Sequence, residues 1–525
     1  MNTHRHPVRF AFLSATLLLA AGCMVGPDFK PPQRAVPPAY LNPSAPPTTQ
    51  TSMTSQKPAE VALWWKTFND PVLDSLVARA VESNLDLRQA TSRLRQARAA
   101  RGVVASALWP DVNANGAYSH SGTGGGGLKT VTTPGGGVST RRTGTSSDLY
   151  QAGFDAAWEI DVFGGVRRSV EASDATIEAA IEDRRDVLVS LVAEVAVDYI
   201  DLRGFQRQIA IAIENLAAQR RTADLTRRKF NAGFISRLDA ANADAQVAST
   251  ESDIPALESS ARQTVYSLSL LLGREPAALL AELSQEQPIP ITPPEVPIGL
   301  PSDLLRRRPD IRRAEAQVHA ATAQIGVATA DLFPKFSLTG SFNLESSKLK
   351  SLGNWTSSFW SMGPSVTWPL FTAGRIQSNI EVQNAFQEQA LITYDQTVLG
   401  ALRDVESALI AYSKEQQRRL ALIDAVAANR DAFDLSTRLY TLGQTDFLNV
   451  LSAERSLFAS ETALTLSDTS IATDLAALYK ALGGGWESGP PPREVAPATR
   501  PDAVPPTASQ PAATRPAPLT PGQNQ

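Results

Sequence analysis

Residues 165–231 read GVRRSVEASDATIEAAIEDRRDVLVSLVAEVAVDYIDLRGFQRQIAIAIENLAAQRRTADLTRRKFN and contain no proline. This run of 67 positions is compatible with helix throughout. At the α-helical rise it predicts a helix roughly 100 Å long. Such a length exceeds that of ordinary globular helices several-fold and is typical of a coiled coil or a tunnel wall.

The same pattern returns in the second half of the chain. A second long helix-compatible run covers about 374–441, and shorter runs cover 71–107, 236–273 and 446–482. The first short run begins at Asp70-Pro71, a good N-cap followed by proline at the first helical position. Pro255 lies inside the run 236–273, where it predicts a kink or a break.

The two halves are related by internal duplication. Trp109-Pro110 matches Phe333-Pro334 at an offset of 224, whereas later matches fall at 208 to 210. The change of offset predicts an insertion in the first half, visible as the Gly-rich stretch 122–137. The later matches are Phe163 with Phe371, Gly165 with Gly374, Phe230 with Tyr440, Gly233 with Gly443, and Gly273 with Gly483.

Each half also contains two segments that alternate between apolar and polar residues, as strands with two different faces do. The four segments cover about 111–119, 150–162, 335–344 and 360–370. They run about 11 residues, the length that a tilted membrane strand needs. A half-buried soluble sheet would show the same alternation, and the pattern alone leaves both alternatives open.

Four strands cannot close a barrel in a membrane, because a lipid-exposed edge would leave backbone groups without partners. If the strands lie in lipid, several copies must pool them, and three copies would supply 12. The fold class predicted is therefore an internally duplicated α+β membrane protein. Its trimeric 12-stranded transmembrane β-barrel takes four strands per chain and continues into a long α-helical periplasmic barrel.

The N-terminus reads as a targeting signal. Arg5 and Arg9 precede an apolar stretch, which ends in Ala20-Ala21-Gly22-Cys23. Small residues before the single cysteine of the chain favour a bacterial lipoprotein signal with lipidation at Cys23. An ordinary secretory signal with an incidental cysteine is the alternative.

Composition argues against an enzyme. The 525 residues include 4 His and 1 Cys and carry a net charge of −4. One cysteine excludes an intramolecular disulfide and a cysteine-based metal cluster. The charge balance excludes a polybasic nucleic-acid footprint. We therefore expect no catalysis, no cofactor, no metal site and no nucleic-acid partner.

Several motifs together resemble the TolC-like outer-membrane efflux proteins, specifically the lipidated OprM-type branch (the NodT family of outer-membrane lipoproteins). They span nearly the whole body: Cys23-Met24-Val25-Gly26-Pro27-Asp28-Phe29, the run 64–71 (WWKTFNDP), Leu108-Trp109-Pro110, the run 304–311 (LLRRRPDI), Ile325-Gly326, Leu332-Phe333-Pro334 and the run 368–374 (WPLFTAG).

The resemblance implies a homotrimer in the outer membrane whose helical tunnel extends into the periplasm. In each half, one long helix would accompany two stacked shorter ones, 71–107 with 236–273 and about 309–331 with 446–482. The implied partners are outer-membrane lipid, a periplasmic adaptor protein and an inner-membrane pump of the resistance–nodulation–division (RND) type.

The candidate sites lie at the two helical hairpin turns, 230–236 and 440–446. Both turns need a glycine at the helix end and a cap for the next helix, and the resemblance adds docking of the adaptor there. It also implies a periplasmic constriction just after the second turn, where related channels carry acidic residues that this chain lacks. The docking residues are Gly233, Ser236, Gly443 and Asp446; the constriction residues are Leu448, Asn449 and Ser452.

Two further features suggest sites, but simpler readings account for them. The arginines 306–308, 312 and 313 could bind an anion, although a run of charges is usually a solvated helix face. His319 is a lone helical histidine, a pattern more typical of a structural residue than of a ligand.

These observations predict six segments: a lipoprotein signal peptide (1–22), a lipidated Pro-rich tether (23–62), a first repeat (63–275), a Pro-rich linker (276–300), a second repeat (301–485) and a Pro/Ala-rich disordered tail (486–525). The predicted function is the passive exit channel of a tripartite efflux system for drugs or other small toxic compounds. Two alternatives remain, a duct for protein or peptide secretion and a structural coiled-coil surface lipoprotein.

Overall fold

The computed structural model describes residues 24–41, 53–55, 61–123, 128–132, 136, 138–142, 145–293 and 295–487. The predicted signal peptide, Cys23 and nearly all of the predicted tail lie outside the described residues. The lipidation site and the disorder of the tail therefore stay predictions.

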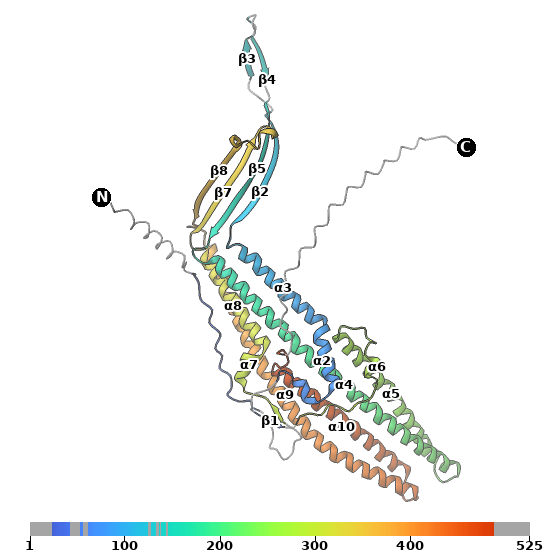
Figure 1. Cartoon of the computed structure of the whole chain (residues 1–525). Helices are drawn as coiled ribbons and strands as arrows, with labels where there is room; N and C mark the ends of the chain where they lie inside the picture. Colours follow the sequence, from blue (N-terminus) through green and yellow to red (C-terminus); the bar gives the residue numbers. More distant parts are fainter. Residues whose placement is uncertain are drawn as a thin grey trace, which may run out of the picture. The chain divides into compact units, whose positions relative to one another are not determined.

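Two helices of equal length form the frame of the molecule. They are α4 (Gly165–Asn231) and α9 (Arg375–Thr441), of 67 residues each. Both follow a glycine in the left-handed conformation, Gly164 and Gly374, which turns the chain out of the preceding strand region. The two long helices predicted from the proline-free runs are confirmed (Figure 1).

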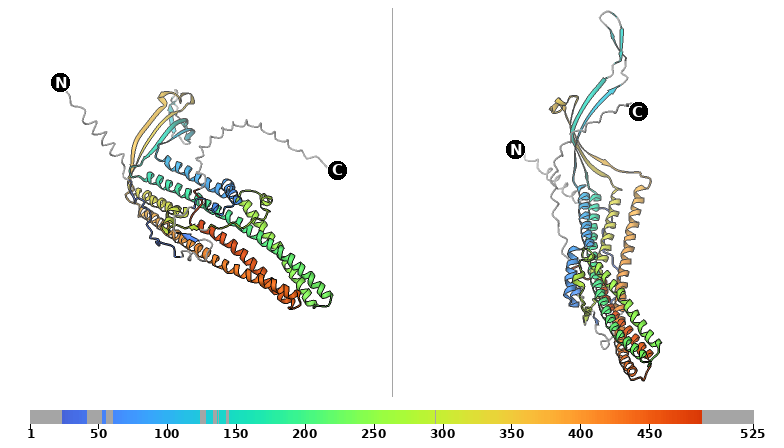
Figure 2. Two further views of the ribbon diagram at one scale, coloured as in Figure 1. Left: turned by 60° about the horizontal axis from the view of Figure 1, so that its bottom comes forward. Right: turned by 90° about the vertical axis from the view of Figure 1, so that its right-hand side faces the viewer.

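Shorter helices lie in stacked pairs beside the two long ones. Near the sheet, α4 packs against α3 (Leu85–Ser106) and α8 (Pro309–Ala330), and α8 also packs against α9. In the other half, α4 packs against α5 (Arg237–Leu271) and α10 (Phe447–Ala481), and α10 packs against α9 (Figure 2). The stacking implied by the family resemblance is therefore confirmed.

The single helix predicted over 71–107 is wrong. The chain forms α2 (Pro71–Ser83) and α3, separated at Asn84, whose ψ of 135° is not helical. The Asn84 side chain accepts a hydrogen bond from the Leu87 amide and donates one to the carbonyl oxygen of Leu271, both at 2.9 Å. Asn84 thus caps α3 and joins it to the end of α5.

The break allowed for at Pro255 is also wrong. Helix α5 continues through this residue from Arg237 to Leu271. A proline removes one backbone donor and leaves the carbonyl four residues earlier without its partner. That carbonyl belongs to Glu251 on an exposed stretch of α5, where water can hydrate it.

The main sheet has four antiparallel strands in the order β2-β5-β7-β8. These are β2 (Asp111–Thr123), β5 (Thr145–Ile160), β7 (Lys335–Ser346) and β8 (Ser358–Thr367), which confirms the four predicted strands. Within the described chain, β2 and β8 each pair on one side only. The predicted insertion carries β3 (Leu128–Thr132) and β4 (Val138–Arg142), paired as a hairpin.

Smaller elements complete the described part. Strand β1 (Met53–Ser55) pairs in parallel with β6 (Glu295–Pro297). The short helices are η1 (Trp64–Phe68), α6 (Leu280–Leu283), α7 (Pro301–Arg307), η2 (Leu349–Ser351) and η3 (Trp355–Ser357). None of the described helices is both long enough and apolar enough to cross a membrane.

The largest hydrophobic core lies at mid-length of the long helices. Trp64 of η1 is fully buried and stacks on Tyr479 of α10 with ring centroids 5.2 Å apart. Helices α2, α4, α9 and α10 contribute apolar side chains to the same cluster. This core fixes the stacked helices at the level where one pair ends and the next begins.

Candidate functional site at the hairpin tips and on the sheet

The two turns that join α4 to α5 and α9 to α10 have the same geometry. Gly233 and Gly443 take φ angles of 79° and 75°, in the region that favours glycine. In each turn the amide after the glycine donates to the carbonyl five residues earlier over 2.9 Å. This hydrogen bond closes the last turn of the long helix and reverses the chain. We call residues 230–236 and 440–446 the two tips.

The residues predicted to cap the following helices lie at the expected N-cap positions. Ser236 Oγ accepts a hydrogen bond from the Asp239 amide at 3.3 Å, and the Asp239 carboxylate accepts one from the Ser236 amide at 3.2 Å. This reciprocal pair is a capping box. Asp446 is the N-cap residue of α10, but its side chain makes no capping hydrogen bond and is exposed.

The tips contact each other through a cation and an aromatic ring. Lys229 of α4 donates from Nζ to the carbonyl oxygen of Tyr440 at 3.0 Å, and the same ammonium lies 3.9 Å from the centre of the Tyr440 ring. That ring packs against Phe447 of α10 with centroids 5.6 Å apart. The two hairpins therefore end as one joined structure.

Each tip has a large apolar side chain that is mostly exposed. Phe234 is 80% exposed and Leu442 is 71% exposed. Neither is buried in a core, so both are accessible to an apolar surface of a partner. The sequence analysis missed these two residues, although an apolar residue beside the turn glycine is a signal that could have revealed them.

The predicted constriction residues share one face of α10. Leu448, Asn449 and Ser452 are all exposed, whereas Phe447 and Val450 are buried. Asn449 donates from Nδ2 to Thr445 Oγ1 at 2.7 Å. The three residues lie together on an uncovered helix face directly above the second tip, which is the placement that a pore-lining position needs.

Polar side chains are buried behind this face. Glu454 of α10 is buried, and its Oε1 has no hydrogen-bond partner among the described residues. The side-chain amide of Gln219 on α4 is likewise buried, and neither its oxygen nor its nitrogen has a hydrogen-bond partner among the described residues.

Burial raises the pKa of Glu454 to about 7, although the nearby Arg455 lowers it. Burial also raises the pKa values of Asp198 and Asp474 to about 6.

We predict that Glu454→Gln stabilises the protein at pH 8 and not at pH 5. A carboxyl group with a raised folded pKa stabilises the fold when protonated, and that stability is lost as the pH rises from about 4.5 to about 7. The neutral amide avoids this loss, which amounts to about 3 kcal/mol at most. The measurement is the urea midpoint of helix unfolding by circular dichroism at both pH values.

The control for this prediction is Glu251→Gln. Glu251 is exposed and pairs with Arg220 at 3.1 Å. Its difference from the parent should stay within about 0.5 kcal/mol at both pH values. Equal effects of Glu454→Gln at pH 5 and pH 8 would contradict a raised pKa.

The four-stranded sheet has one apolar and one polar face. Phe154, Trp360 and Met362 lie exposed on the apolar face. On the other face, hydroxyl pairs bridge β7 and β8, with Ser337–Ser365 oxygens 2.7 Å apart and Ser341–Ser361 oxygens 2.9 Å apart. A soluble sheet would bury its apolar face, and this one leaves it open.

Matching tryptophans close the base of the sheet in both repeats. The indole nitrogen of Trp158 donates to the Leu108 carbonyl at 3.0 Å, and that of Trp368 donates to the Leu332 carbonyl at 3.1 Å. Amphipathic rings at this level are typical of the boundary between lipid and water. Trp158 and Trp368 lie at the same offset, 210 positions, as several matches between the two repeats, but the sequence analysis did not pair them.

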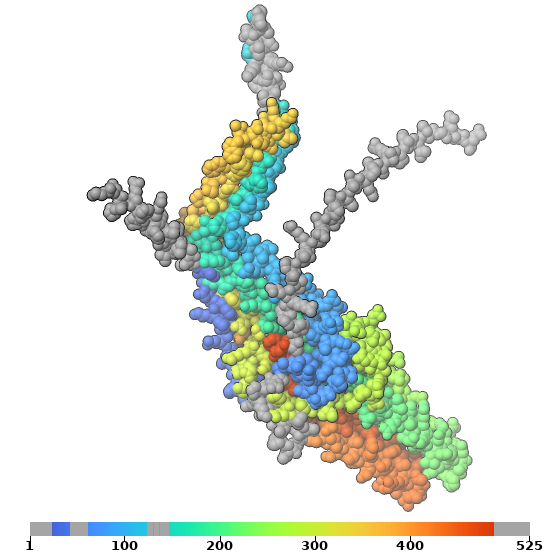
Figure 3. All heavy atoms as spheres, viewed as in Figure 1, coloured from blue at the N-terminus to red at the C-terminus, as the bar shows by residue number. Residues whose placement is uncertain are grey.

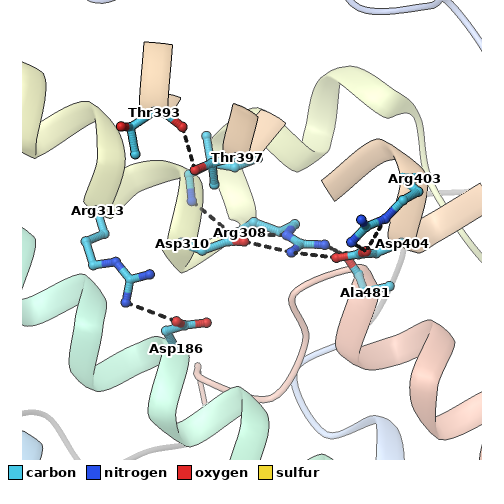
Figure 4. A network of polar contacts seen from close by, with 10 residues as sticks. Asp186, Arg308, Asp310, Arg313, Thr393, Thr397, Arg403, Asp404 and Ala481 are labelled. Atoms are coloured by element: carbon cyan, nitrogen blue, oxygen red, sulfur yellow. Dashed lines mark hydrogen bonds and ion pairs between the residues drawn. The ribbon is translucent and has the colours of Figure 1, made fainter. Parts of the chain in front are cut away.

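Arg308 and Arg313 of the arginine run form ion pairs within the protein (Figure 4), so the solvated face expected for the run holds only for the exposed Arg306. Arg308 donates to Asp310 at 2.7 Å, to Asp404 of α9 at 3.4 Å and to the carbonyl of Ala481 at 2.8 Å. Arg313 bridges to Asp186 of α4 at 3.2 Å. Arg308 and Arg313 thus join α8 to α9, α10 and α4.

His319 has the structural role predicted for it. Its ring stacks on Phe29 with centroids 4.3 Å apart, and its Nε2 lies 3.1 Å from a carboxylate oxygen of Glu171. Among the residues that the structure describes, no group of His, Cys, Asp or Glu side chains is arranged to hold a metal ion.

Both outer edges of the helical layer expose apolar side chains. Helix α9 buries far fewer residues than α4, although the two are equally long. Its exposed apolar residues are Val382, Phe386, Ile392, Leu399, Ile410, Ile423 and Leu435. At the opposite edge, α3 and α5 expose Leu85, Val103, Leu238 and Leu270.

Comparisons with known proteins agree over most of the chain. The family described as outer membrane efflux protein matches residues 76–274 and 300–484. Nodulation protein T of Rhizobium leguminosarum bv. trifolii is 31% identical over 471 residues, which cover 89% of this chain and 96% of that protein. The probable efflux pump outer membrane protein TtgC of Pseudomonas putida is 32% identical over 480 residues, covering 90% of this chain and 95% of that protein. The solved structure of the outer-membrane channel OprN superposes with a TM-score of 0.79 at 37% identity and covers 89% of this chain and 100% of that one.

Proposed function

Because the chain belongs to the outer membrane efflux protein family, we propose that three copies of it form the exit duct of a tripartite efflux system. The chain is an outer-membrane efflux channel. The duct would be passive, and its cargo would be drugs or other small toxic compounds. The observation that carries the proposal is a four-stranded sheet whose apolar face is exposed and whose two edges pair with no further strand among the described residues.

Lipid explains both properties of the sheet. An apolar face is stable against acyl chains, and each unpaired edge needs a strand from elsewhere, because lipid offers no hydrogen bonds. Joining β8 of one copy to β2 of the next satisfies both edges, and three copies give 12 strands. The polar face, with its serine pairs, would then line a water-filled lumen.

The helical layer supports the same assembly. Its two edges, α9 on one side and α3 with α5 on the other, both expose apolar side chains. Contact between these edges of neighbouring copies would bury them and continue the barrel into the periplasm. The exposed face with Leu448, Asn449 and Ser452 would line the narrow end of this tunnel.

The remaining parts of the proposal concern attachment and partners. Cys23 would carry the lipid anchor in the outer membrane. Phe234 and Leu442, next to the predicted docking glycines Gly233 and Gly443, would be covered by a periplasmic adaptor. Energy would come from an inner-membrane pump of the RND type, since the duct itself includes no catalysis.

The proposal is tested in purified protein and in cells. The full chain should run as a heat-resistant trimer in detergent and conduct ions across a planar bilayer. A deletion strain should become more susceptible to at least one compound in a panel of drugs, solvents and metal ions, and the parent gene should reverse this. A purified monomer without conductance would overturn the proposal.

We predict that Phe234→Asp and Leu442→Asp abolish export while the trimer still forms. Both side chains are exposed, so their loss should change the free energy of unfolding by no more than about 0.5 kcal/mol. Loss of an apolar contact at a partner interface costs more than about 1 kcal/mol for each central residue. The measurements are crosslinking to the adaptor and survival on the exported compound.

The matched control is Gln444→Asp, which adds the same charge at an exposed position of the second tip without removing an apolar group. It should retain export. Normal export by Phe234→Asp together with Leu442→Asp would show that the adaptor does not dock on these side chains.

A further inference from the structure

The residues that follow Cys23 are bound to the body of the protein, although the sequence predicted a tether. The Val25 amide donates to the carbonyl of Phe163 at 3.1 Å, between the end of β5 and the start of α4. Beside it, Met24 lies against the backbone of Gly164, so closely that a Cβ atom there would come within 2.9 Å of the methionine Cα. In Figure 3 this segment, in dark blue, lies directly on the helices.

Arg168, in the first turn of α4, holds the segment. Its side chain is only 2% exposed. Nε donates to the Val25 carbonyl at 3.1 Å, and Nη2 donates to Asp28 at 2.7 Å and to the Gly26 carbonyl at 3.4 Å. The remaining nitrogen, Nη1, bonds Glu171 at 2.8 Å. A buried guanidinium is stable only with such partners, and most of these acceptors come from the N-terminal segment.

Two glycines let the segment approach α8. Gly26 has a φ of 89°, and a Cβ atom on it would lie 2.5 Å from the Cα of Gly326. A Cβ atom on Gly326 would in turn lie 2.8 Å from Cγ of Arg168. Residues 24–29 and the motif 325–326, far apart in the sequence, therefore meet at one place. The stack of Phe29 on His319 closes the far end of the contact.

We propose that residues 24–29 form a latch, bound by Arg168, which holds the lipid anchor of Cys23 at a fixed height beside the base of the sheet. This inference rests on the proposed lipidation and barrel. Arg168 is a positioning residue, because it acts through the segment and touches no cargo. One residue, Met24, separates the anchor from the first latch hydrogen bond at Val25.

The latch changes how far the anchor can move. With the latch closed, Cys23 is one Cα–Cα step, about 3.8 Å, from the bound Met24. If residues 24–29 came free while Arg34 stayed paired with Asp395 of α9, the anchor could reach roughly 40 Å from that point. A closed latch therefore keeps the acyl chains in the leaflet next to Trp158 and Trp368, which cap the base of the sheet.

The test measures the mobility of the segment in the lipidated full-length protein. Cys23 is the only cysteine and would be acylated, so Lys30→Cys supplies a single free thiol for a nitroxide label. In nanodiscs the label should be immobilised. Gly26→Ala alters only the segment, and Arg168→Gln removes the donor; each should give a mobile spectrum. Trypsin cleavage after Arg34 should rise about tenfold or more in both variants.

The controls separate the latch from general stability. Arg101→Gln removes an exposed ion pair with Asp174 and should leave the label immobile. Arg168→Lys keeps the charge but cannot reach all the acceptors, so it should give an intermediate spectrum. An unchanged spectrum for Gly26→Ala, with helix content and acylation intact, would overturn the latch. That outcome would leave the channel assignment standing, because trimer formation and conductance are measured on the same samples.

Discussion

Met362→Lys will abolish the proposed heat-resistant trimer, and the neighbouring Ser361→Lys will leave it intact. Met362 lies at the middle of β8 on the apolar face and is 74% exposed in the single chain. Ser361 faces the other side, bonded to Ser341. A lysine on a lipid-facing strand at mid-membrane costs about 2–4 kcal/mol, and a lysine facing a water-filled lumen costs little. The proposed trimer would incur that cost three times.

The experiment compares the two variants in outer-membrane fractions. Unheated samples on a denaturing gel report the trimer, and conductance in planar bilayers reports the open barrel. Ser361→Lys should also shift ion selectivity toward anions, since it adds positive charge to the lumen. Equal tolerance of both lysines would show that the apolar face is not in lipid, and the barrel would have to be abandoned.

Arg308→Ala will lower the free energy of unfolding by about 3–5 kcal/mol, because it removes a guanidinium that is only 12% exposed and leaves Asp310, 18% exposed, without its ion-pair partner. Arg308 lies where α7 meets α8 and joins Asp310, Asp404 and the end of α10 (Figure 4). Its loss removes the polar contacts that join α8 to α9 and α10 at the level where the stacked pairs of helices meet. The measurement is the denaturant midpoint of helix unfolding.

The matched control is Arg403→Ala. Arg403 also bonds Asp404, at 2.8 Å, but its side chain is 77% exposed. Its removal should cost no more than about 0.5 kcal/mol. If the two variants lose equal stability, the effect comes from the charge near Asp404 and not from the junction that Arg308 makes.

The long helices and the strands could be predicted because their signals are local and repeated. Two runs of 67 residues without proline leave no other regular structure for α4 and α9. The break at Asn84 could not be predicted, because the contact that favours it joins Asn84 to Leu271, 187 residues away. Asp404, a partner of Arg308, and Asp186, a partner of Arg313, likewise come from other helices, so the charge run looked solvated.

The tips were predicted in position but not in full. Gly233 and Gly443 indicate a helix end, because a helix often ends at a residue in the left-handed conformation, which glycine adopts easily. The exposure of Phe234 and Leu442 depends on the absence of a covering element, which no local pattern records. The segment 24–29 looked like part of a tether because it opens a longer stretch, 23–62, that is rich in proline and polar residues. Its buried partner Arg168 lies about 140 residues further along.

The two unpaired edges of the sheet have a genetic consequence. In the proposed trimer, a chain completes its wall only with strands from its neighbours and so shares every duct with the products of other gene copies. If a cell made equal amounts of parent chain and of a Phe234→Asp chain that still assembles, random mixing into threes would leave only about one duct in eight wholly parental. Such an allele would therefore be dominant, and resistance would fall in a cell that still expresses a fully functional gene.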